Sequence, residues 1–261
     1  MALSGKTILI TRSKDSSAEL CSLLESREAS VICFPTVEIK EPESWEACDN
    51  AIWKLAEYQS VCFTSKNAVT KFVERIRSIR PQAVDTLATR NIFAIGERTK
   101  RSLESSGFSV LATPKHASAE EMTKLLQMHQ IKGAKILFPK SNIAREELPQ
   151  QLRSLGAMVD EVIVYYTVIP EPENLERIRQ LFLEKKIDVT TFFSPSSILN
   201  FTEMIGSEVL AHTIIAAIGP TTAETAQQLG LPTTILAQYA TAESLVSSIE
   251  NHFMKSQIGG S

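Results

Sequence analysis

The chain of 261 residues lacks the features that mark membrane-bound and exported proteins. No apolar run approaches the roughly 20 residues that a membrane-spanning helix needs, and the N-terminus has neither a signal peptide nor a transit peptide. The four cysteines all lie in the first quarter of the chain and never form C-x-x-C, which favours buried thiols over disulfides. We therefore expect a cytoplasmic protein without a membrane partner.

Sequence motifs for several common chemistries are also missing. Neither G-x-G-x-x-G nor G-x-S-x-G occurs. Gly5-Lys6-Thr7 resembles the end of a Walker loop, but its strand follows the motif instead of preceding it. The four histidines lack a spacing typical of metal ligands, and a net charge near −3 gives no attraction for nucleic acid. Nucleotide, serine-hydrolase, metal and nucleic-acid functions lose their main support, and we expect no cofactor.

What the sequence does contain is an internal repeat. NIFAIGERTKRSLESSGF, from Asn91, matches IIAAIGPTTAETAQQLGL, from Ile214, at an offset of 123 residues. HASAEEMTKLL and YATAESLVSSI continue the match at the same offset. Two further pairs extend it, SVCFTSKNAVTKF with VTTFFSPSSILNF and KTILITR with AKILFPK. A register kept over this length indicates a duplication.

Each half of the repeat alternates apolar strands with amphipathic helices. In the first half, a strand at residues 7–10 precedes a helix with Leu20, Leu23 and Leu24 on its apolar face, and a strand follows at residues 31–34. This alternation is typical of parallel βαβ sheets. Hydrophobic residues at 43% and charged residues at 22% suit a globular protein. The sequence therefore predicts an α/β protein with two similar domains, each built on a parallel sheet.

Two extended segments lie at equivalent points of the repeat, at residues 34–39 and 165–169. Their β-branched and aromatic composition suggests that they pair with each other as a two-stranded connection between the domains. If the chain crosses at the first segment and returns at the second, the middle of the sequence forms one domain and the two ends form the other. Two consecutive domains that divide near Gly133 fit the repeat equally well.

Six predicted strands end in polar turns, and these turns hold the candidate binding residues. In open α/β sheets, ligands bind outside the carboxyl ends of the strands. The helix starts that follow present N–H groups and a positive dipole end, which suit carboxylates or phosphates. Ser194-Pro195 and Gly219-Pro220 have the sequence of a helix start, a cap residue followed by proline. For any single turn, helix capping alone is an equally good interpretation.

Tyr165 is the candidate for chemistry on the second extended segment. Its phenol could donate a proton or a hydrogen bond to a leaving hydroxyl group. A tyrosine that packs its ring and keeps its hydroxyl in water would explain the position as well. Tyr166 points to the opposite face of the strand, so only one of the two side chains can serve a given site.

Taken in order, these segments resemble the uroporphyrinogen-III synthase family, the cofactor-free cyclases of tetrapyrrole, porphyrin and heme biosynthesis. The resemblance runs through ILITR, FTSKNAV, AIGERT, VYYTV, TFFSPSSILNF and AAIGPTTAETA and covers nearly the whole chain. It implies the crossover arrangement, in which residues 1–37 join residues 168–261 in one lobe and residues 38–167 form a second, inserted lobe. It also implies a lyase, and nothing in the sequence demands more than a monomer.

Members of this family act on hydroxymethylbilane, a linear tetrapyrrole with a hydroxymethyl group on its first ring and eight carboxylates. The resemblance implies that hydroxide leaves to give an azafulvene, that the substituted carbon of the last pyrrole attacks to give a spiro intermediate, and that the ring closes with ring D inverted. No metal, nucleotide or covalent nucleophile is required. Because the bilane also closes unaided to the uninverted isomer, positioning would supply much of the selectivity.

The resemblance assigns roles residue by residue. Tyr165 matches the tyrosine of the family's V-Y-x-T-V segment and becomes the candidate that assists departure of hydroxide. Thr99 is a less direct match than the others, since GERT stands where the second copy has GPTT. The candidates for recognition of carboxylates or pyrrole N–H groups are Thr11, Arg12, Ser13, Ser65, Lys66, Gly96, Thr99, Lys140, Arg145, Ser194, Ser197, Gly219, Thr221 and Thr222.

Two functions fit these observations. One is the synthase, and the other is a two-domain binding protein that closes on an anionic small molecule without chemistry. Only the synthase needs the Tyr165 hydroxyl. The expected partners are the substrate hydroxymethylbilane and, in transient contact, the enzyme that supplies it; neither nucleic acid nor membrane is expected.

Overall fold

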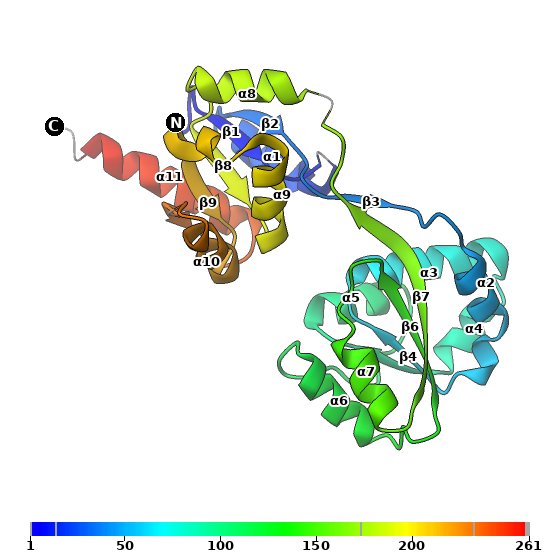
Figure 1. The fold of residues 1–261 in the computed structure, drawn as a ribbon. Coiled ribbons are helices and arrows are strands. Elements are labelled where there is room, and N and C mark those ends of the chain that lie inside the picture. The colour runs from blue at the N-terminus through cyan, green and yellow to red at the C-terminus, as the bar shows by residue number, and fades with distance from the viewer. Residues whose placement is uncertain (1, 14, 173, 232, 259–261) are drawn as a thin grey trace. The chain divides into compact units, whose positions relative to one another are not determined.

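The structure, a computed structural model, describes residues 2–13, 15–172, 174–231 and 233–258. These residues form two compact units, each built around a five-stranded sheet with helices packed against it (Figure 1). Unit 1 combines the residues up to Glu38 with those from Val168 onward, and unit 2 contains Ile39–Thr167. The prediction of an α/β protein with two largely parallel sheets is confirmed. None of the helices among the described residues is long and apolar enough to cross a membrane.

Unit 1 contains a sheet in the order β10-β9-β8-β1-β2, with all paired strands parallel. Its strands are β1 (Thr7–Ile10), β2 (Ser30–Cys33), β8 (Val189–Phe192), β9 (Ile214–Ala217) and β10 (Ile235–Leu236). Its helices are α1 (Ala18–Glu25), α8 (Leu175–Leu183), α9 (Pro195–Ile205), α10 (Pro220–Gln228) and α11 (Ala242–Ile258), with short 3-10 turns at Asp15–Ser17 and Glu208–His212. Helices α1 and α11 pack on one face of the sheet, and α8, α9 and α10 pack on the other.

Unit 2 contains a sheet in the order β3-β7-β6-β4-β5, in which β7, β6, β4 and β5 pair in parallel. Its strands are β3 (Glu38–Lys40), β4 (Ser60–Phe63), β5 (Asn91–Ala94), β6 (Lys135–Ser141) and β7 (Met158–Val168). Its helices are α2 (Glu46–Trp53), α3 (Lys66–Ile79), α4 (Ala83–Ala88), α5 (Glu97–Ser105), α6 (Ala119–Gln127) and α7 (Glu147–Ser154), with a 3-10 turn at Leu55–Glu57. Helices α2 to α5 cover one face, and α6 and α7 cover the other.

The two sheets repeat the same strand order. The sequence β9-β8-β1-β2 in unit 1 corresponds to β5-β4-β6-β7 in unit 2. Ile235 of β10 pairs with Ala216 of β9, and 123 residues earlier Ala112 makes an isolated bridge with Phe93 of β5. The duplication read from the sequence is therefore present in the pairing of the strands, down to single residues.

The two connecting segments meet as β3 and β7, which are neighbours at one side of the second sheet. This confirms the predicted pairing, although the first strand is shorter than expected. The strand begins at Glu38 instead of at residue 34, and Pro35, which has no N–H to donate, lies in the segment between β2 and β3. The second segment is the end of the 11-residue strand β7, so Tyr165 belongs to the sheet of unit 2.

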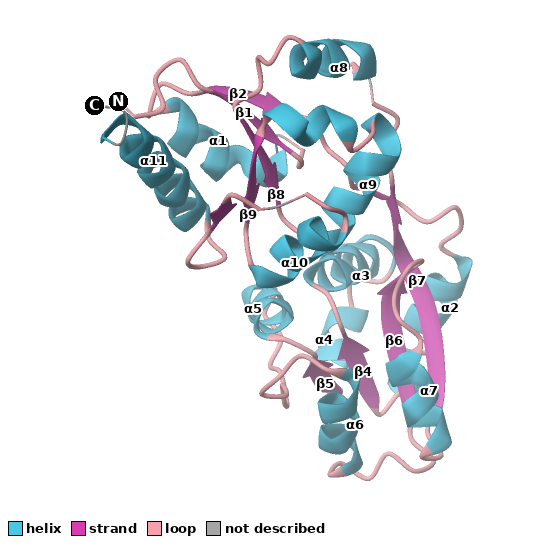
Figure 2. Ribbon diagram, turned by 60° about the vertical axis from the view of Figure 1, so that its left-hand side comes forward, coloured by secondary structure: helices cyan, strands magenta, loops and turns pink. Residues whose placement is uncertain are grey.

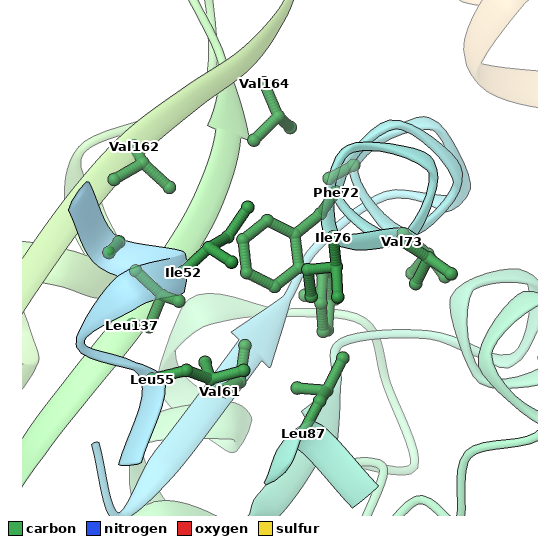
Figure 3. Close-up of a cluster of buried hydrophobic side chains, with 14 of the residues drawn as sticks. Ile52, Leu55, Val61, Phe72, Val73, Ile76, Leu87, Leu137, Val162 and Val164 are labelled. Carbon is green, nitrogen blue, oxygen red and sulfur yellow. The ribbon is translucent and has the colours of Figure 1, made fainter. Parts of the chain in front are cut away.

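Equivalent phenylalanines occupy the cores of the two units. In unit 2, Phe72 of α3 points toward Ile52 and Ile76, and Val164 of β7 closes the cluster above it (Figure 3). In unit 1, Phe201 of α9 packs edge-to-face against three other phenylalanine rings. Full burial of such a side chain stabilises the fold by about 1.5–3 kcal/mol. These contacts attach α3 and α9 to their sheets.

Candidate active site

Three of the predicted turns come together at the carboxyl edge of the sheet in unit 1. Strands β9, β8 and β1 are neighbours and run parallel, so the segments that follow them share this edge. These segments begin near Gly219, Ser194 and Thr11. Helices α9 and α10, which start there, lie side by side (Figure 2). Two helix N-termini and one loop therefore lie along one side of this sheet.

The start of α9 has the predicted capping pattern, in which the Ser197 hydroxyl both accepts and donates hydrogen bonds within the cap. The Ser194 Oγ accepts a hydrogen bond from the Ser197 N–H at 3.2 Å, and the Ser197 Oγ accepts one from the Ser194 N–H at 3.1 Å. Pro195 lies in the first turn, where a missing N–H costs nothing. Ser197 is buried and also donates to the Ser194 carbonyl at 2.6 Å. The Ser197 hydroxyl therefore serves the cap, and the Ser194 hydroxyl is the more accessible of the two.

Helix α10 begins at Gly219 without a side-chain cap. Gly219 has an extended backbone with φ of −170°, and a Cβ placed on it would meet no atom of the described residues within 4 Å. Neither backbone conformation nor packing within the described structure therefore requires glycine at this position. A glycine here leaves the approach to the first N–H groups of the helix open. Thr221 is exposed beside this approach, whereas Thr222 is buried.

The loop after β1 presents Arg12 at the surface of unit 1. Thr11 is buried, and its Oγ1 donates to the Thr191 carbonyl at 2.8 Å. The Arg12 guanidinium lies over the ring of Phe193, 4.4 Å from its centroid, a cation–π contact that places it next to the start of α9. The Ser13 hydroxyl lies 2.8 Å from that of Ser16. Of the three residues predicted in this loop, Arg12 is the one that offers positive charge to an anionic ligand.

Two residues that the sequence reasoning missed attach the first connecting segment to this edge. Thr36 is fully buried, and its Oγ1 donates to the Thr11 carbonyl at 3.4 Å. The Asn200 side-chain amide, from α9, donates to the Thr36 carbonyl at 2.8 Å. The repeat held a signal for this role, because Thr36 matches Thr167 of the V-Y-x-T-V segment. The segment that leaves unit 1 is thus hydrogen-bonded to the β1 loop and to α9.

In unit 2, Ser65 and Tyr165 meet at the carboxyl edge of the sheet. Ser65 follows β4 and caps α3, and its Oγ accepts a hydrogen bond from the Ala68 N–H at 3.0 Å. The Tyr165 hydroxyl lies 3.0 Å from the same Oγ. Tyr165 is 6% exposed, and its ring belongs to the core cluster that α3 covers. The two residues, 100 positions apart in the chain, therefore form one hydrogen-bonded pair.

Gly96 and Thr99 repeat, in α5, the geometry of the α10 start. Gly96 is extended, with φ of −159°, and Thr99 is buried. A Cβ on Gly96 would meet the Ala117 Cβ at 3.6 Å, an ordinary contact. Glu97, however, places a carboxylate in the first turn of this helix. That charge weakens the attraction of the α5 start for an anion relative to that of α10.

Lys140, predicted as a partner for a substrate carboxylate, is already occupied by carboxylates of the protein. The residue is 8% exposed at the end of β6, where its ammonium forms ion pairs with Glu146 and Glu161. Arg153 pairs with the other oxygen of Glu161 at 2.7 Å. Burial lowers the pKa of Lys140, but the hydrogen bonds to Glu146 and Glu161 outweigh burial and raise it. The ammonium is charged, and two carboxylates of the protein already neutralise it. Lys140 is therefore no longer a candidate ligand for a substrate carboxylate.

Lys66 and Arg145, in contrast, are exposed. Lys66 is the first residue of α3, directly after Ser65. Arg145 lies in the loop between β6 and α7. Both follow strand ends of the second sheet, and both can therefore reach an anionic ligand from unit 2.

The four cysteines were expected to be buried free thiols. None of the four is in a disulfide, and all but Cys33 are buried. Burial raises the pKa of the Cys48 and Cys62 thiols to about 12, so both are protonated at neutral pH. Among the described residues, no group of three or more His, Cys, Asp or Glu side chains could hold a metal ion.

Comparison with known proteins points to a single family. A family model described as "Uroporphyrinogen-III synthase HemD" matches residues 3–247. The uroporphyrinogen-III synthase of Chlorobaculum parvum is 31% identical over 245 residues, which cover 94% of this chain and 98% of the relative. That of Synechococcus elongatus is 30% identical over 259 residues, with coverage of 95% and 96%. The matches extend through both units.

Solved structures agree in fold. A mutant uroporphyrinogen III synthase from Thermus thermophilus superimposes with a TM-score of 0.70 and covers 96% of this chain and 99% of its own. The uroporphyrinogen-III synthetase of Helicobacter pylori gives a TM-score of 0.61, with 95% and 99% covered. Each is 16% identical to this chain, so the likeness concerns the fold alone.

Proposed function

We propose, because this chain belongs to the uroporphyrinogen-III synthase family, that it cyclises hydroxymethylbilane to uroporphyrinogen III with loss of water and inversion of ring D. The observation that carries the proposal is the family match, which runs from residue 3 to residue 247 and includes both sheets and both connecting segments. Relatives of matching length carry the name of this activity. The protein would thus be a cyclising lyase of heme biosynthesis.

The carboxyl edge of unit 1 supports recognition of a substrate rich in carboxylates. Helix N-termini bind carboxylates through their N–H groups and the positive end of the dipole. Gly219 leaves the start of α10 open, and Thr221 adds an exposed hydroxyl there. Arg12 adds a positive charge beside the start of α9, where the Ser194 hydroxyl is accessible. We assign carboxylate recognition in unit 1 to these four residues.

Unit 2 contributes exposed cations at equivalent strand ends. Lys66 and Arg145 have accessible side chains, and Gly96 opens the start of α5. Thr11, Ser197, Thr99 and Thr222 are buried, so in this proposal they support the turns instead of contacting the substrate. Ser13 is half-buried beside Ser16 and has the weakest support of the predicted ligands.

In this proposal, Tyr165 donates the proton that the leaving hydroxyl group needs. As the C–O bond of the hydroxymethyl group breaks, the electron pair leaves with oxygen, and the phenol proton converts that oxygen to water. The pyrrole nitrogen lone pair forms the new double bond and gives the azafulvene in its protonated form, which keeps its N–H proton and whose positive charge the phenolate balances. When ring D has attacked, rearranged and lost its ring proton, the phenolate takes a proton back. One water is released, and the tyrosine ends as it began.

The test is to mix the purified protein with freshly made hydroxymethylbilane and to separate the products by isomer. We expect uroporphyrinogen III to form in proportion to protein concentration. Heat-unfolded protein serves as the control and gives the spontaneous rate to the uninverted isomer. Formation of the uninverted isomer alone, at that spontaneous rate, would end the proposal.

A further inference from the structure

Ser65 makes two contacts of different kinds with a single hydroxyl group. Its Oγ accepts the Ala68 N–H at 3.0 Å, which is a helix cap, and it lies 3.0 Å from the Tyr165 hydroxyl, which is a long-range contact. A serine hydroxyl has one proton to donate and two lone pairs with which to accept. With one lone pair given to Ala68, the proton is still available to the phenol oxygen.

The direction of the Ser65–Tyr165 hydrogen bond decides where the phenol proton points. If Tyr165 donates, its proton is held inside the pair. If Ser65 donates, the phenol proton is turned away from Ser65 and can go to another acceptor. A hydroxyl that already accepts a hydrogen bond donates more strongly, so the bond from Ala68 favours donation by Ser65. The positive end of α3, where Lys66 is the first residue, adds to this preference as negative charge develops on the phenol oxygen.

In the second copy of the repeat, the equivalent serine caps its helix without contacting a tyrosine. Ser194 matches Ser65 and caps α9 in the same way, but its Oγ lies 3.0 Å from the hydroxyl of Ser196 in its own helix. The residue that matches Tyr165 is Phe34, which has no hydroxyl and packs edge-to-face on Phe201 at 5.7 Å. A cap serine therefore needs no tyrosine, and the pairing of Ser65 with Tyr165 is specific to unit 2.

We propose that Ser65 is the positioning residue of Tyr165: it donates to the phenol oxygen, turns the phenol proton toward the leaving hydroxyl, and holds the phenolate that forms. This inference rests on the proposed role of Tyr165 in the cyclisation. Ser65 itself exchanges no proton with the substrate, because its hydrogen bond shortens and lengthens while the phenol loses and regains its own proton. It thus acts through Tyr165, and not as the carboxylate ligand that the sequence suggested.

The experiment compares Ser65→Ala, Ser65→Thr and Ser118→Ala in the cyclisation assay. Ser118 is the matched control, because it caps α6 of the same unit through the Glu121 N–H at 3.2 Å. Each alanine removes one cap, worth about 1 kcal/mol of stability. We expect Ser65→Ala to lower kcat about tenfold, or ~1.4 kcal/mol, with KM within about twofold. Ser65→Thr, which keeps a hydroxyl, should recover most of kcat, and Ser118→Ala should keep it.

A double-mutant cycle with Tyr165→Phe separates positioning from a general structural effect. If Ser65 acts through the phenol, Ser65→Ala lowers kcat no further once Tyr165 has been replaced. An equal loss in both backgrounds, or a loss no larger than that of Ser118→Ala, overturns the inference. These results differ from a failure of the proposed function, in which the unaltered protein itself forms only the uninverted isomer.

Discussion

Tyr165, the proposed proton donor, combines a ring that belongs to a core with a hydroxyl at the edge of a sheet. Its ring is buried with the residues that α3 covers, while its hydroxyl is placed at the carboxyl edge beside Ser65. Burial of the ring holds the oxygen in one position, and a fixed donor transfers a proton with less loss of entropy than a mobile one. The neighbouring residue Tyr166 is half-buried.

Replacement of Tyr165 by Phe removes the hydroxyl and keeps the ring. We expect kcat to fall at least tenfold, about 1.4 kcal/mol of barrier, with little change in KM. Steady-state kinetics with isomer separation measures this change, and Tyr166→Phe is the matched control. A kcat within about twofold of the unaltered protein, roughly 0.4 kcal/mol, would show that the phenol has no major part in the chemistry.

Glu161 predicts a pH dependence of stability. Burial raises the pKa of this carboxyl, but hydrogen bonds from Lys140 and Arg153 outweigh burial and hold the pKa below the ordinary value of 4.5. A lowered folded-state pKa contributes stability that is complete above the ordinary value and is lost as the pH falls through the lowered one. We expect the free energy of unfolding to fall less steeply below pH 4.5 in Glu161→Gln than in the unaltered protein. Urea unfolding at a series of pH values measures both slopes, and equal slopes would contradict the assignment.

At the scale of elements, α10 and α5 are two copies of one helix start that have diverged. Both begin at an extended glycine that the described surroundings do not require. Serine is a better cap than glycine by a few tenths of a kcal/mol, so stability alone gives no reason to retain glycine. A ligand that approaches the first N–H groups closely does give a reason. The carboxylate of Glu97 in the first turn of α5 then favours α10 over α5 for an anion.

Gly219→Ser therefore separates stability from activity. We expect the melting temperature to stay the same or to rise slightly, since the new hydroxyl can cap α10. We expect kcat/KM to fall several-fold, because the added side chain occupies the approach to the helix start. Gly96→Ser, which makes the same change at α5, should cost less activity. If Gly219→Ser keeps its full kcat/KM, the start of α10 does not bind the substrate.

The sequence predicted local features such as helix caps correctly, but it did not predict which side chains pair over long distances in the chain. Ser194-Pro195 predicted its cap because capping involves residues within one turn of a helix. The ion pairs of Lys140 were not predicted, because Glu161 lies on the next strand, 21 residues later, and Glu146 lies in the loop that follows β6, where no periodic pattern indicates which side chains meet. Asn200 was missed for the same reason, since its acceptor at Thr36 is 164 residues away. The repeat did reveal long-range order, because equivalent strands must pair equivalently.

At the scale of the whole molecule, the chain forms two units with separate sheets and separate cores. Phe72 in unit 2 and Phe201 in unit 1 occupy equivalent helix positions, and both are fully buried. Loss of such a ring costs about 3–5 kcal/mol. Since the cores share no residues, each loss should be confined to the unit that carries it.

Native-state hydrogen exchange tests this independence with the matched pair Phe72→Ala and Phe201→Ala. We expect Phe72→Ala to lower the protection of amides in β4 and β6 and to spare those in β1 and β8. Phe201→Ala should give the reverse pattern. If each variant lowers protection equally in both sheets, the two units unfold as one cooperative body.

The position of β1 in its sheet also sets an order of events during synthesis. β1 pairs with β2 on one side and with β8 on the other, and the first residue of β8 is Val189. At about 5–20 residues per second, the ribosome needs on the order of ten to forty seconds to reach β8. All of unit 2 precedes β8 in the chain, so the inserted half can fold before the half that surrounds it. Until β8 arrives, one edge of β1, which carries the apolar residues Ile8, Leu9 and Ile10, stays unpaired and can bind another chain.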